Sequence, residues 1–408
     1  MDKTDTSLSH THKPIRILRI INRFNLGGPT YNVAYLSKYI SSQFETLLIG
    51  GAKDESEESS DFIVQHLGLQ PLIIEEMHRK IDLKNDIAAY KKIKRIILEF
   101  KPDIVHTHAS KAGTIGRLAA ANCGVPVIVH TFHGHVFHSY FGKLKTSFYK
   151  NIERFLARKS HAIVAISDKQ KDELTRIHRI CNENKVHVIP LGFDLNKFQS
   201  NQEEKRKAFR ERYQVQEDEL VISIIGRLVN VKNHPLFLEA IKQVSTQTSC
   251  KIRAFIIGDG EDRQRIEAKA KELNLAFSDA TESKISTLLT FTSWIKDIDI
   301  ALAGSDIITL TSFNEGTPVS LIEAQAANKP IVTTNVGGIE NVVLPGITAL
   351  LCENNNVAQF AGQLLKVIED KDLRIKMSEQ GWKHVKEKFH FSRLVKDMEE
   401  MYRKLLTQ

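Results

Sequence analysis

The chain has 408 residues, of which 42% are hydrophobic and 26% charged, a composition typical of soluble globular proteins with two or three domains. It contains no run of 18 or more apolar residues, so we expect no membrane-spanning helix. The formal net charge of +8 fits either an anionic partner (a nucleic acid, a membrane surface or a phosphorylated substrate) or simply a solvated, lysine-rich surface.

Residues 1–13 are polar and lack an apolar stretch, so we expect a disordered lead-in rather than a secretory signal. The cysteines show no paired spacing of the kind that metal or redox motifs have; they are Cys123, Cys181, Cys250 and Cys352. Disulfide bonds are therefore not expected, and a reducing cytoplasm fits the composition best.

The first half of the chain alternates short strand-like runs with longer helical ones. The strand-like runs are rich in Val and Ile and nearly continuous, which is typical of strands buried on both faces of a parallel sheet. We expect strands at 15–22, 103–108, 125–132, 161–167 and 185–190, with helices between them such as 31–40 and 87–100.

The apolar periodicity lapses between residues 190 and 207, which indicates a linker, and the alternation then restarts. In the second half we expect strands at 219–227, 251–260, 287–292, 305–311 and 329–335, followed from about residue 356 by helices. This α/β pattern predicts two doubly wound, Rossmann-like parallel-sheet domains that face each other across a cleft. In such sheets, ligands bind beyond the carboxyl ends of the strands.

One helix start in the second half is suited to an anion. The stretch FNEGTPVSLIEAQA (313–326) follows a predicted strand, and Pro318 fits the first turn of a helix. The amides of Gly316, Thr317 and Val319 then point out of the helix start, where the helix dipole favours a phosphate.

Four charged side chains follow the carboxyl ends of two predicted strands. Glu315 lies at the strand-to-helix bend, and Glu323 is shielded by apolar neighbours and needs donors such as sugar or ribose hydroxyls. Alternatively, Glu315 caps the helix and Glu323 is exposed. Arg227 and Lys232 follow the strand at 219–227 and offer phosphate a fork of donors and a mobile point charge.

Several motifs gain meaning from their order along the chain. In the first half they are FNLGGPTYNVAYL (24–36), HTHASKAGTIGRLAA (106–120), HTFHGHVF (130–137) and VIPLGFDLNKF (188–198). In the second half they are GRLVNVKN (226–233), IIGDGEDRQRIE (256–267), EGTPVSLIE (315–323) and KPIVTTNVGGIENVV (329–343). Together they resemble the retaining glycosyltransferases of family four (glycosyltransferase group 1), which have the GT-B fold.

The resemblance implies a site for a nucleotide-sugar donor. Arg227 and Lys232 would hold the diphosphate and stabilise the leaving nucleotide. Glu323 would accept hydrogen bonds from the ribose, and Glu315 would contact hydroxyls of the donor sugar. Trp294 falls where the family encloses the nucleobase.

The resemblance also assigns residues of the first half. Gly27 and Gly28 match the glycine loop, whose missing side chains let helix amides approach the reacting centre. His133 matches the histidine near the donor sugar. Relatives often carry a glutamate where this chain has Asn341; the adjacent Glu340 is an alternative, and the position stays unassigned.

The final helix, 389–408, resembles the family's last helix, which crosses back onto the first domain. The predicted domains are therefore 14–192 joined by 389–408, on the acceptor side, and 193–388, which binds the nucleotide-sugar. The basic amphipathic stretch 143–159 either lies on an anionic membrane or packs its apolar stripe into a core.

The histidines allow two interpretations, a metal cluster or the polar lining of a cleft. No ordered cysteine or acidic ligands accompany them, so we favour the lining and expect neither a metal nor another cofactor. Asp297 and Asp299 are interpreted as helix-capping residues. The histidines concerned are His106, His108, His130, His133, His135 and His138.

The sequence predicts a cytoplasmic hexosyltransferase that uses a nucleotide diphosphate-sugar, taken as a UDP-sugar. Its acceptor would be a glycan or a lipid-linked glycan in polysaccharide or lipopolysaccharide biosynthesis. One alternative is a sugar-nucleotide 2-epimerase of related fold, which explains 226–233 less well. Another is a non-catalytic protein that binds anions or nucleic acid, although no aromatic-basic recognition module is present. A nicotinamide enzyme fits poorly because Gly258 and Gly260 lack a third glycine.

Overall fold

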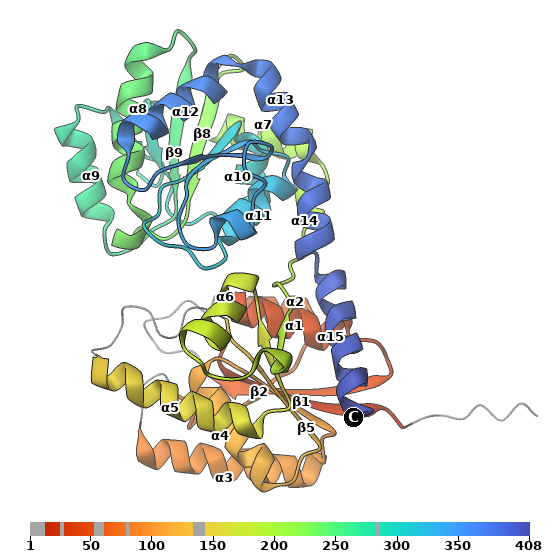
Figure 1. Ribbon diagram of the computed structural model, residues 1–408. Coiled ribbons are helices and arrows are strands. Elements are labelled where there is room, and N and C mark those ends of the chain that lie inside the picture. Colours follow the sequence, from red (N-terminus) through yellow and green to blue (C-terminus); the bar gives the residue numbers. More distant parts are fainter. Residues whose placement is uncertain (1–12, 25–27, 53–60, 79–81, 134–142, 283–285) are drawn as a thin grey trace, which may run out of the picture. The chain divides into compact units, whose positions relative to one another are not determined.

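The computed structural model describes residues 13–24, 28–52, 61–78, 82–133, 143–282 and 286–408. The chain folds into two compact units, Met1–Phe193 with Phe391–Gln408, and Asp194–His390. The last helix, α15 (Phe391–Leu406), therefore belongs to the first unit, where it packs beside α1 (Gly28–Tyr39) (Figure 1). Among the described residues, no helix combines the length and the apolar character needed to cross a membrane.

A seven-stranded parallel sheet forms the centre of the first unit. Because strands are added outward from β1 and β4 in opposite directions, their carboxyl ends form the switch point of a doubly wound sheet. From one edge to the other the strands are β3 (Leu72–Ile73), β2 (Phe44–Gly51), β1 (Ile15–Arg23), β4 (Ile104–His108), β5 (Val127–Thr131), β6 (Ala162–Ala165) and β7 (Val186–Val188).

Helices cover both faces of this sheet, because alternate residues of each strand point to opposite faces. Leu18 and Ile20 of β1 pack with α3 and α4, whereas Ile17 packs with α1 and α15. The remaining helices of the unit are α2 (Asp61–His66), α3 (Leu83–Phe100), α4 (Ser110–Asn122), α5 (Lys143–Lys159) and α6 (Asp168–Asp172).

The second unit repeats the architecture. Its parallel strands are β10 (Phe277–Asp279), β11 (Leu289–Phe291), β9 (Ile252–Ile257), β8 (Leu220–Ile225), β12 (Ile307–Leu310), β13 (Ile331–Thr334) and β14 (Ala349–Cys352). Its helices are α7 (Gln202–Arg212), α8 (His234–Gln247), α9 (Arg263–Glu272), α10 (Ile298–Gly304), α11 (Val319–Ala326), α12 (Val357–Glu369), α13 (Lys371–Glu379) and α14 (Gly381–Phe389). The switch point lies between β8 and β12.

Short helical turns complete both units; they are Glu173–Ile177, Glu183–Lys185, Asn196–Phe198, Asn230–Lys232 and Ile339–Asn341. The predicted fold class, two doubly wound parallel-sheet units, is confirmed, and all four cysteines are free thiols. The expected strands were found to within a few residues, but β2, β3, β10 and β14 were missed.

Candidate functional site

Two loops of the second unit meet at the switch point. The first follows β8 and contains Arg227 and the short turn Asn230–Lys232. The second follows β12 and leads into α11. Because β8 and β12 are hydrogen-bonded neighbours, the loops at their carboxyl ends lie at the same edge of the sheet.

The two loops are tied together around an ion pair. The Lys232 Nζ lies 2.6 Å from Glu315 Oε1, and the Ser312 hydroxyl donates to the same oxygen at 2.5 Å. The Thr311 hydroxyl donates to the carbonyl of Lys232 at 2.9 Å, and the Phe313 amide donates to the carbonyl of Val231 at 2.8 Å. The Lys232 and Glu315 side chains keep 21% and 10% of their surfaces exposed, so the pair remains accessible to a ligand.

Glycines allow the backbones to approach one another here. Gly258, after β9, has φ +138°, and a Cβ at this position would lie 2.0 Å from the carbonyl oxygen of Gly226. Gly337, after β13, has φ +58°, and its Cβ would lie 2.0 Å from the carbonyl oxygen of Glu315. A larger residue at either position would push these neighbouring loops apart.

The start of α11 faces open space beside Glu315. Gly316 is exposed, and a Cβ on it would meet no atom within 4 Å. The predicted helix start near Pro318 is confirmed to within one residue: Pro318 is the N-cap, with ψ of 101°, and α11 begins at Val319. The first-turn amides therefore start at Val319, preceded by the extended backbone of Pro318.

Arg227 and Trp294 are exposed side chains outside the Lys232–Glu315 ion pair. Arg227 is solvent-exposed and pairs with Glu261, at 3.2 Å between Nη2 and Oε2. Trp294 is 52% exposed and follows Ser293, whose carbonyl accepts the Gly258 amide at 3.0 Å. Both side chains are exposed, and among the described residues no hydrogen bond joins either of them to Lys232.

Glu323 is an unusual carboxyl. It lies on α11, and burial raises its pKa to about 7, although Lys197 opposes the rise. Within the described residues, no group hydrogen-bonds to its carboxyl oxygens. Hydroxyl donors supplied by a ligand would therefore stabilise the ionised form of this carboxyl.

Three of the six histidines predicted to line a cleft are core residues, so the prediction is wrong for these three. His106, His108 and His130 are fully buried, and burial lowers the pKa of each well below its usual value. His133 is half-buried and follows β5.

Gly28 begins α1, where a Cβ would touch only Leu191, at 3.6 Å. Gly27, His135 and His138 lie outside the described residues.

Asp297 and Asp299 lie at the start of α10, as predicted. Asp297 occupies the N-cap position, although its side chain makes no hydrogen bond to the helix, and Asp299 lies in the first turn and pairs with Lys205 at 2.9 Å. Glu340 accepts a hydrogen bond from Asn335 at 2.8 Å. In the part of the chain that is described, no group of three or more His, Cys, Asp or Glu side chains is arranged to hold a metal ion.

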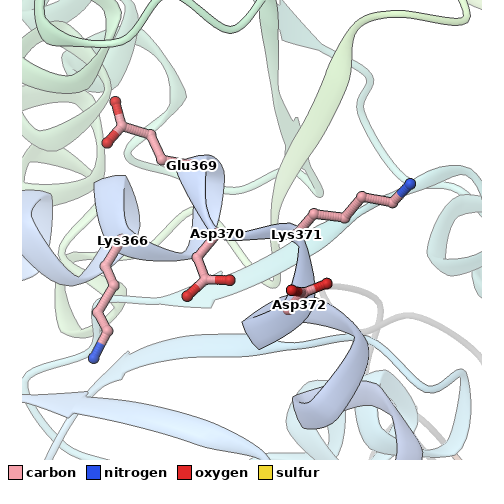
Figure 2. A pocket seen from close by; sticks show the side chains of 5 residues that line it. All are labelled: Lys366, Glu369, Asp370, Lys371 and Asp372. Carbon is pink, nitrogen blue, oxygen red and sulfur yellow. The ribbon is translucent and has the colours of Figure 1, made fainter.

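A hollow of about 480 Å³ lies far from these loops in the sequence, at the junction of α12 and α13. Figure 2 shows that its side chains point in different directions rather than toward a common centre. It is lined by Lys366, Glu369, Asp370, Lys371 and Asp372. Nothing in this arrangement selects a ligand.

Sequence reasoning missed the hydroxyls that support the ion pair. Ser312 and Thr311 come directly after β12, and a strand-end hydroxyl next to a loop carboxylate is the signal that could have shown them. It also missed the contact between His108 and His133, because nothing in the spacing of residues 25 apart predicts it.

Comparisons with known proteins agree with this arrangement. Residues 205–384 match the family Glycosyl transferases group 1, and residues 26–197 match Glycosyltransferase Family 4. An Escherichia coli protein named UDP-Gal:alpha-D-GlcNAc-diphosphoundecaprenol alpha-1,3-galactosyltransferase is 31% identical over 325 residues, 79% of each chain. The capsular polysaccharide biosynthesis glycosyltransferase CapM of Staphylococcus aureus is 27% identical over 342 residues, 82% of this chain and 86% of CapM.

Solved structures share the fold at low sequence identity. A glycosyltransferase from Rickettsia africae has a TM-score of 0.77 at 20% identity, covering 97% of this chain and 99% of its own. HepE from Anabaena, in complex with UDP, has a TM-score of 0.79 at 16% identity, covering 96% and 100%. These likenesses establish the GT-B fold. Because two family matches span most of the sequence and the E. coli relative is 31% identical, this chain belongs to the group 1 glycosyltransferases of family 4.

Proposed function

We propose that the protein is a retaining hexosyltransferase that moves a sugar from a UDP-sugar to a lipid-linked glycan during cell-surface polysaccharide synthesis. The observation that carries this proposal is the Lys232–Glu315 pair at the switch point beside the start of α11. A mobile cation, a carboxylate and unpaired helix amides at one place suit a substrate that joins a diphosphate to a sugar.

The chemistry follows from where charge develops. The bond between the anomeric carbon of the donor sugar and the phosphate oxygen breaks, and that oxygen becomes negative. Lys232, Arg227 and the amides at the start of α11 stabilise it, as preorganised electrostatics does in many enzymes. The acceptor hydroxyl attacks from the side of the departing group and passes its proton to the phosphate oxygen, so the configuration is retained.

Glu315 has a binding role in this mechanism rather than a covalent one. Its Oε1 is already engaged by Ser312 and Lys232, which leaves the other oxygen for donor-sugar hydroxyls. Glu323 accepts hydrogen bonds from the ribose, and the exposed Trp294 provides a platform for the nucleobase. His133 contacts the donor sugar in the same scheme, and Gly28 exposes the first amides of α1.

The donor and acceptor classes are supported by the relatives' names. The E. coli relative is named for a UDP-galactose donor and a diphosphoundecaprenol-linked acceptor, and the S. aureus relative for capsular polysaccharide biosynthesis. HepE was crystallised with UDP and with UDP-glucose. We therefore propose that the protein acts on nucleotide-sugars in the cytoplasm. Lipopolysaccharide is among the proposed end products.

The reaction is proposed to need no metal or other cofactor, because Lys232 and Arg227 supply the positive charge that a divalent cation would otherwise bring. Transfer that persists in excess EDTA supports this part of the proposal. Transfer that EDTA abolishes and Mg²⁺ or Mn²⁺ restores contradicts it.

A lipid-linked acceptor would bring the protein to a membrane surface, and α5 is the segment proposed to make that contact. Phe148 and Phe155 are 62% and 49% exposed, seven residues apart on one side of the helix. Arg158 is exposed nearby, and the Lys159 ammonium lies 5.0 Å from the centre of the Phe155 ring. Exposed aromatic rings among cations are typical of helices that lie on anionic lipid.

The decisive experiment combines ligand binding with turnover. UDP and UDP-hexoses should raise the thermal unfolding temperature more than GDP, ADP or their sugars. With a lipid-linked glycan present, UDP and an elongated lipid should appear in equal amounts. Epimerisation of the nucleotide-sugar at C2, or UDP release that needs no acceptor, would favour the epimerase. Binding of nucleic acid without any response to nucleotide-sugars would favour the non-catalytic alternative.

A further inference from the structure

The ends of β4 and β5 place two histidine rings in contact. His108 is the last residue of β4, and His133 follows the neighbouring strand β5. The His108 Nδ1 and the His133 Nε2 are 2.9 Å apart, and the two rings are stacked with their centres 5.2 Å apart. One nitrogen must therefore carry the hydrogen that the other accepts.

Both rings are neutral in the free protein. Burial lowers the pKa of His108 well below its usual value and that of His133 to about 3. The charge of Arg19 acts on His108 in the same direction. Two neutral rings carry two N–H hydrogens, of which one lies between them. The second hydrogen is on His108 Nε2 or on His133 Nδ1, and within the described residues both of these buried atoms lack a hydrogen-bond partner.

The neighbouring ring of His106 already has hydrogen-bond partners for both of its nitrogens. Arg19 donates to the Tyr402 oxygen at 2.8 Å, so the Tyr402 hydroxyl hydrogen is directed to His106 Nδ1, 2.6 Å away. The opposite nitrogen of His106 then carries its hydrogen and donates to the Thr131 hydroxyl at 2.7 Å. The His106 ring lies against His108 at a tilt, with centres 4.2 Å apart, but both of its nitrogens are already engaged and neither is free to hydrogen-bond to His108.

The second hydrogen therefore belongs on His133. His108 is fully buried, and an unpaired N–H in that position would be more costly than an unpaired acceptor nitrogen. His133 is the half-buried member of the pair and lies after the end of β5, although its Nδ1 atom is itself buried. The Nδ1–H of His133 is then a buried donor without a partner among the described residues, which an oxygen of a ligand would satisfy.

We propose that His108 is a positioning residue: its Nδ1–H holds His133 in the Nδ1–H tautomer, so that His133 offers a hydrogen-bond donor to an oxygen of the bound sugar substrate. The substrate contact rests on the proposed function. The tautomer does not, because it is a property of the free protein.

The test reads the tautomer directly. In protein labelled with ¹⁵N-histidine, two-bond ¹H–¹⁵N correlation spectra show which nitrogen of His133 is protonated. The wild type should show the Nδ1–H form. His108→Ala, which removes the donor, should shift His133 toward the Nε2–H form, and His108→Asn should retain the Nδ1–H form because the Asn amide takes the place of the His Nδ1–H. His187→Asn, on β7, is the control and should leave the His133 signals unchanged.

Transfer activity provides the second readout. His108→Ala should lower kcat about 10- to 100-fold with little change in KM for the nucleotide-sugar, and His108→Asn should recover most of the loss. A wild-type His133 protonated on Nε2, or a His133 tautomer that is the same in His108→Ala, overturns the proposal. The expected tautomers in a protein that transfers no sugar uphold the positioning role and reject the proposed function instead.

Discussion

At the scale of single residues, Lys232 is the group on which the proposed reaction depends most. In the proposed reaction, Lys232 is the mobile cation beside the departing phosphate. Loss of one such group commonly costs about 3–4 kcal/mol of transition-state stabilisation. We expect Lys232→Ala to lower turnover at least ~100-fold. The measurement is steady-state transfer with each nucleotide-sugar that binds.

Lys251 supplies the matched control for this variant. It lies in the same unit, and its ammonium pairs with Asp218 at 2.6 Å on the exposed surface, so Lys251→Ala should leave turnover and folding intact. Near-normal turnover of Lys232→Ala, with unchanged circular dichroism, would contradict the assignment of Lys232.

Glu323 gives a prediction about pH. Its pKa is raised to about 7 in the folded protein, so the neutral form stabilises the fold below the unfolded value near 4.5. That contribution is lost as the pH rises through about 7. Glu323→Gln stays neutral and should gain stability over the wild type by roughly 1–3 kcal/mol at pH 8, and by little at pH 4.5.

Fluorescence suits this measurement because both tryptophans, Trp294 and Trp382, lie in the second unit. Urea unfolding at several pH values gives the difference between Glu323→Gln and the wild type. A difference that does not change between pH 4.5 and 8 would show that the Glu323 carboxyl titrates normally. The same variant should bind UDP more weakly, since an amide nitrogen replaces one acceptor oxygen.

Residue-level prediction from the sequence named candidates where a strand end and a helix start lie close together in the chain. Glu315 and Lys232 were identified as site candidates in this way, although their ion pair was not foreseen. The hydrogen bonds of the buried histidines could not be predicted from the sequence, because His106 hydrogen-bonds to Tyr402, a residue 296 positions away. The assigned roles of the site residues stay predictions.

At the scale of elements, α5 packs one part of its surface into the core and leaves two aromatic rings exposed, and its contact with a membrane stays a prediction. Leu156 and Ala157 are buried, whereas Phe148 and Phe155 are exposed. The double variant Phe148→Ser/Phe155→Ser should therefore lower binding to phosphatidylglycerol vesicles about 10-fold, because apolar burial drives such contacts. Vesicle sedimentation at low salt measures the effect.

A matched pair of exposed apolar residues lies on α3. Ile87 and Leu98 are 55% and 56% exposed, so Ile87→Ser/Leu98→Ser removes a similar apolar surface from another helix. This control should bind vesicles like the wild type. Equal losses from α3 and α5, or no loss from α5, would remove α5 as the membrane contact.

Strand prediction failed where an element was short or its residues were mixed. β3 has two residues and β10 three, too few to show any periodicity. β2 reads FETLLIGG, in which polar residues and two glycines obscure the apolar run. The long apolar strands β1, β8 and β9 were predicted because burial on both faces leaves a continuous signal in the sequence.

At the scale of the whole molecule, the chain leaves the first unit near Phe193 and returns to it at Phe391. These two passages are joined within the first unit, where the Phe391 amide donates to the Phe193 carbonyl at 3.0 Å. The Arg393 guanidinium reinforces the junction by donating to the carbonyls of Pro190 and Leu191, at 2.6 and 2.9 Å. The first unit is therefore completed only after the second has been synthesised.

The return of α15 makes the first unit dependent on the end of the chain. Met398 is buried in the same apolar cluster as Ile17 of β1 and Ile104 of β4, whereas Lys396 on the same helix is exposed. Met398→Asp should place an unpaired charge in that cluster and abolish soluble expression, as should truncation before Phe389. Lys396→Asp should remain soluble and active. A truncated or Met398→Asp enzyme with normal solubility and turnover would show that the first unit folds without α15. Strong loss from Lys396→Asp as well would point instead to the helix's charge or propensity, because the two substitutions introduce the same side chain and differ in burial.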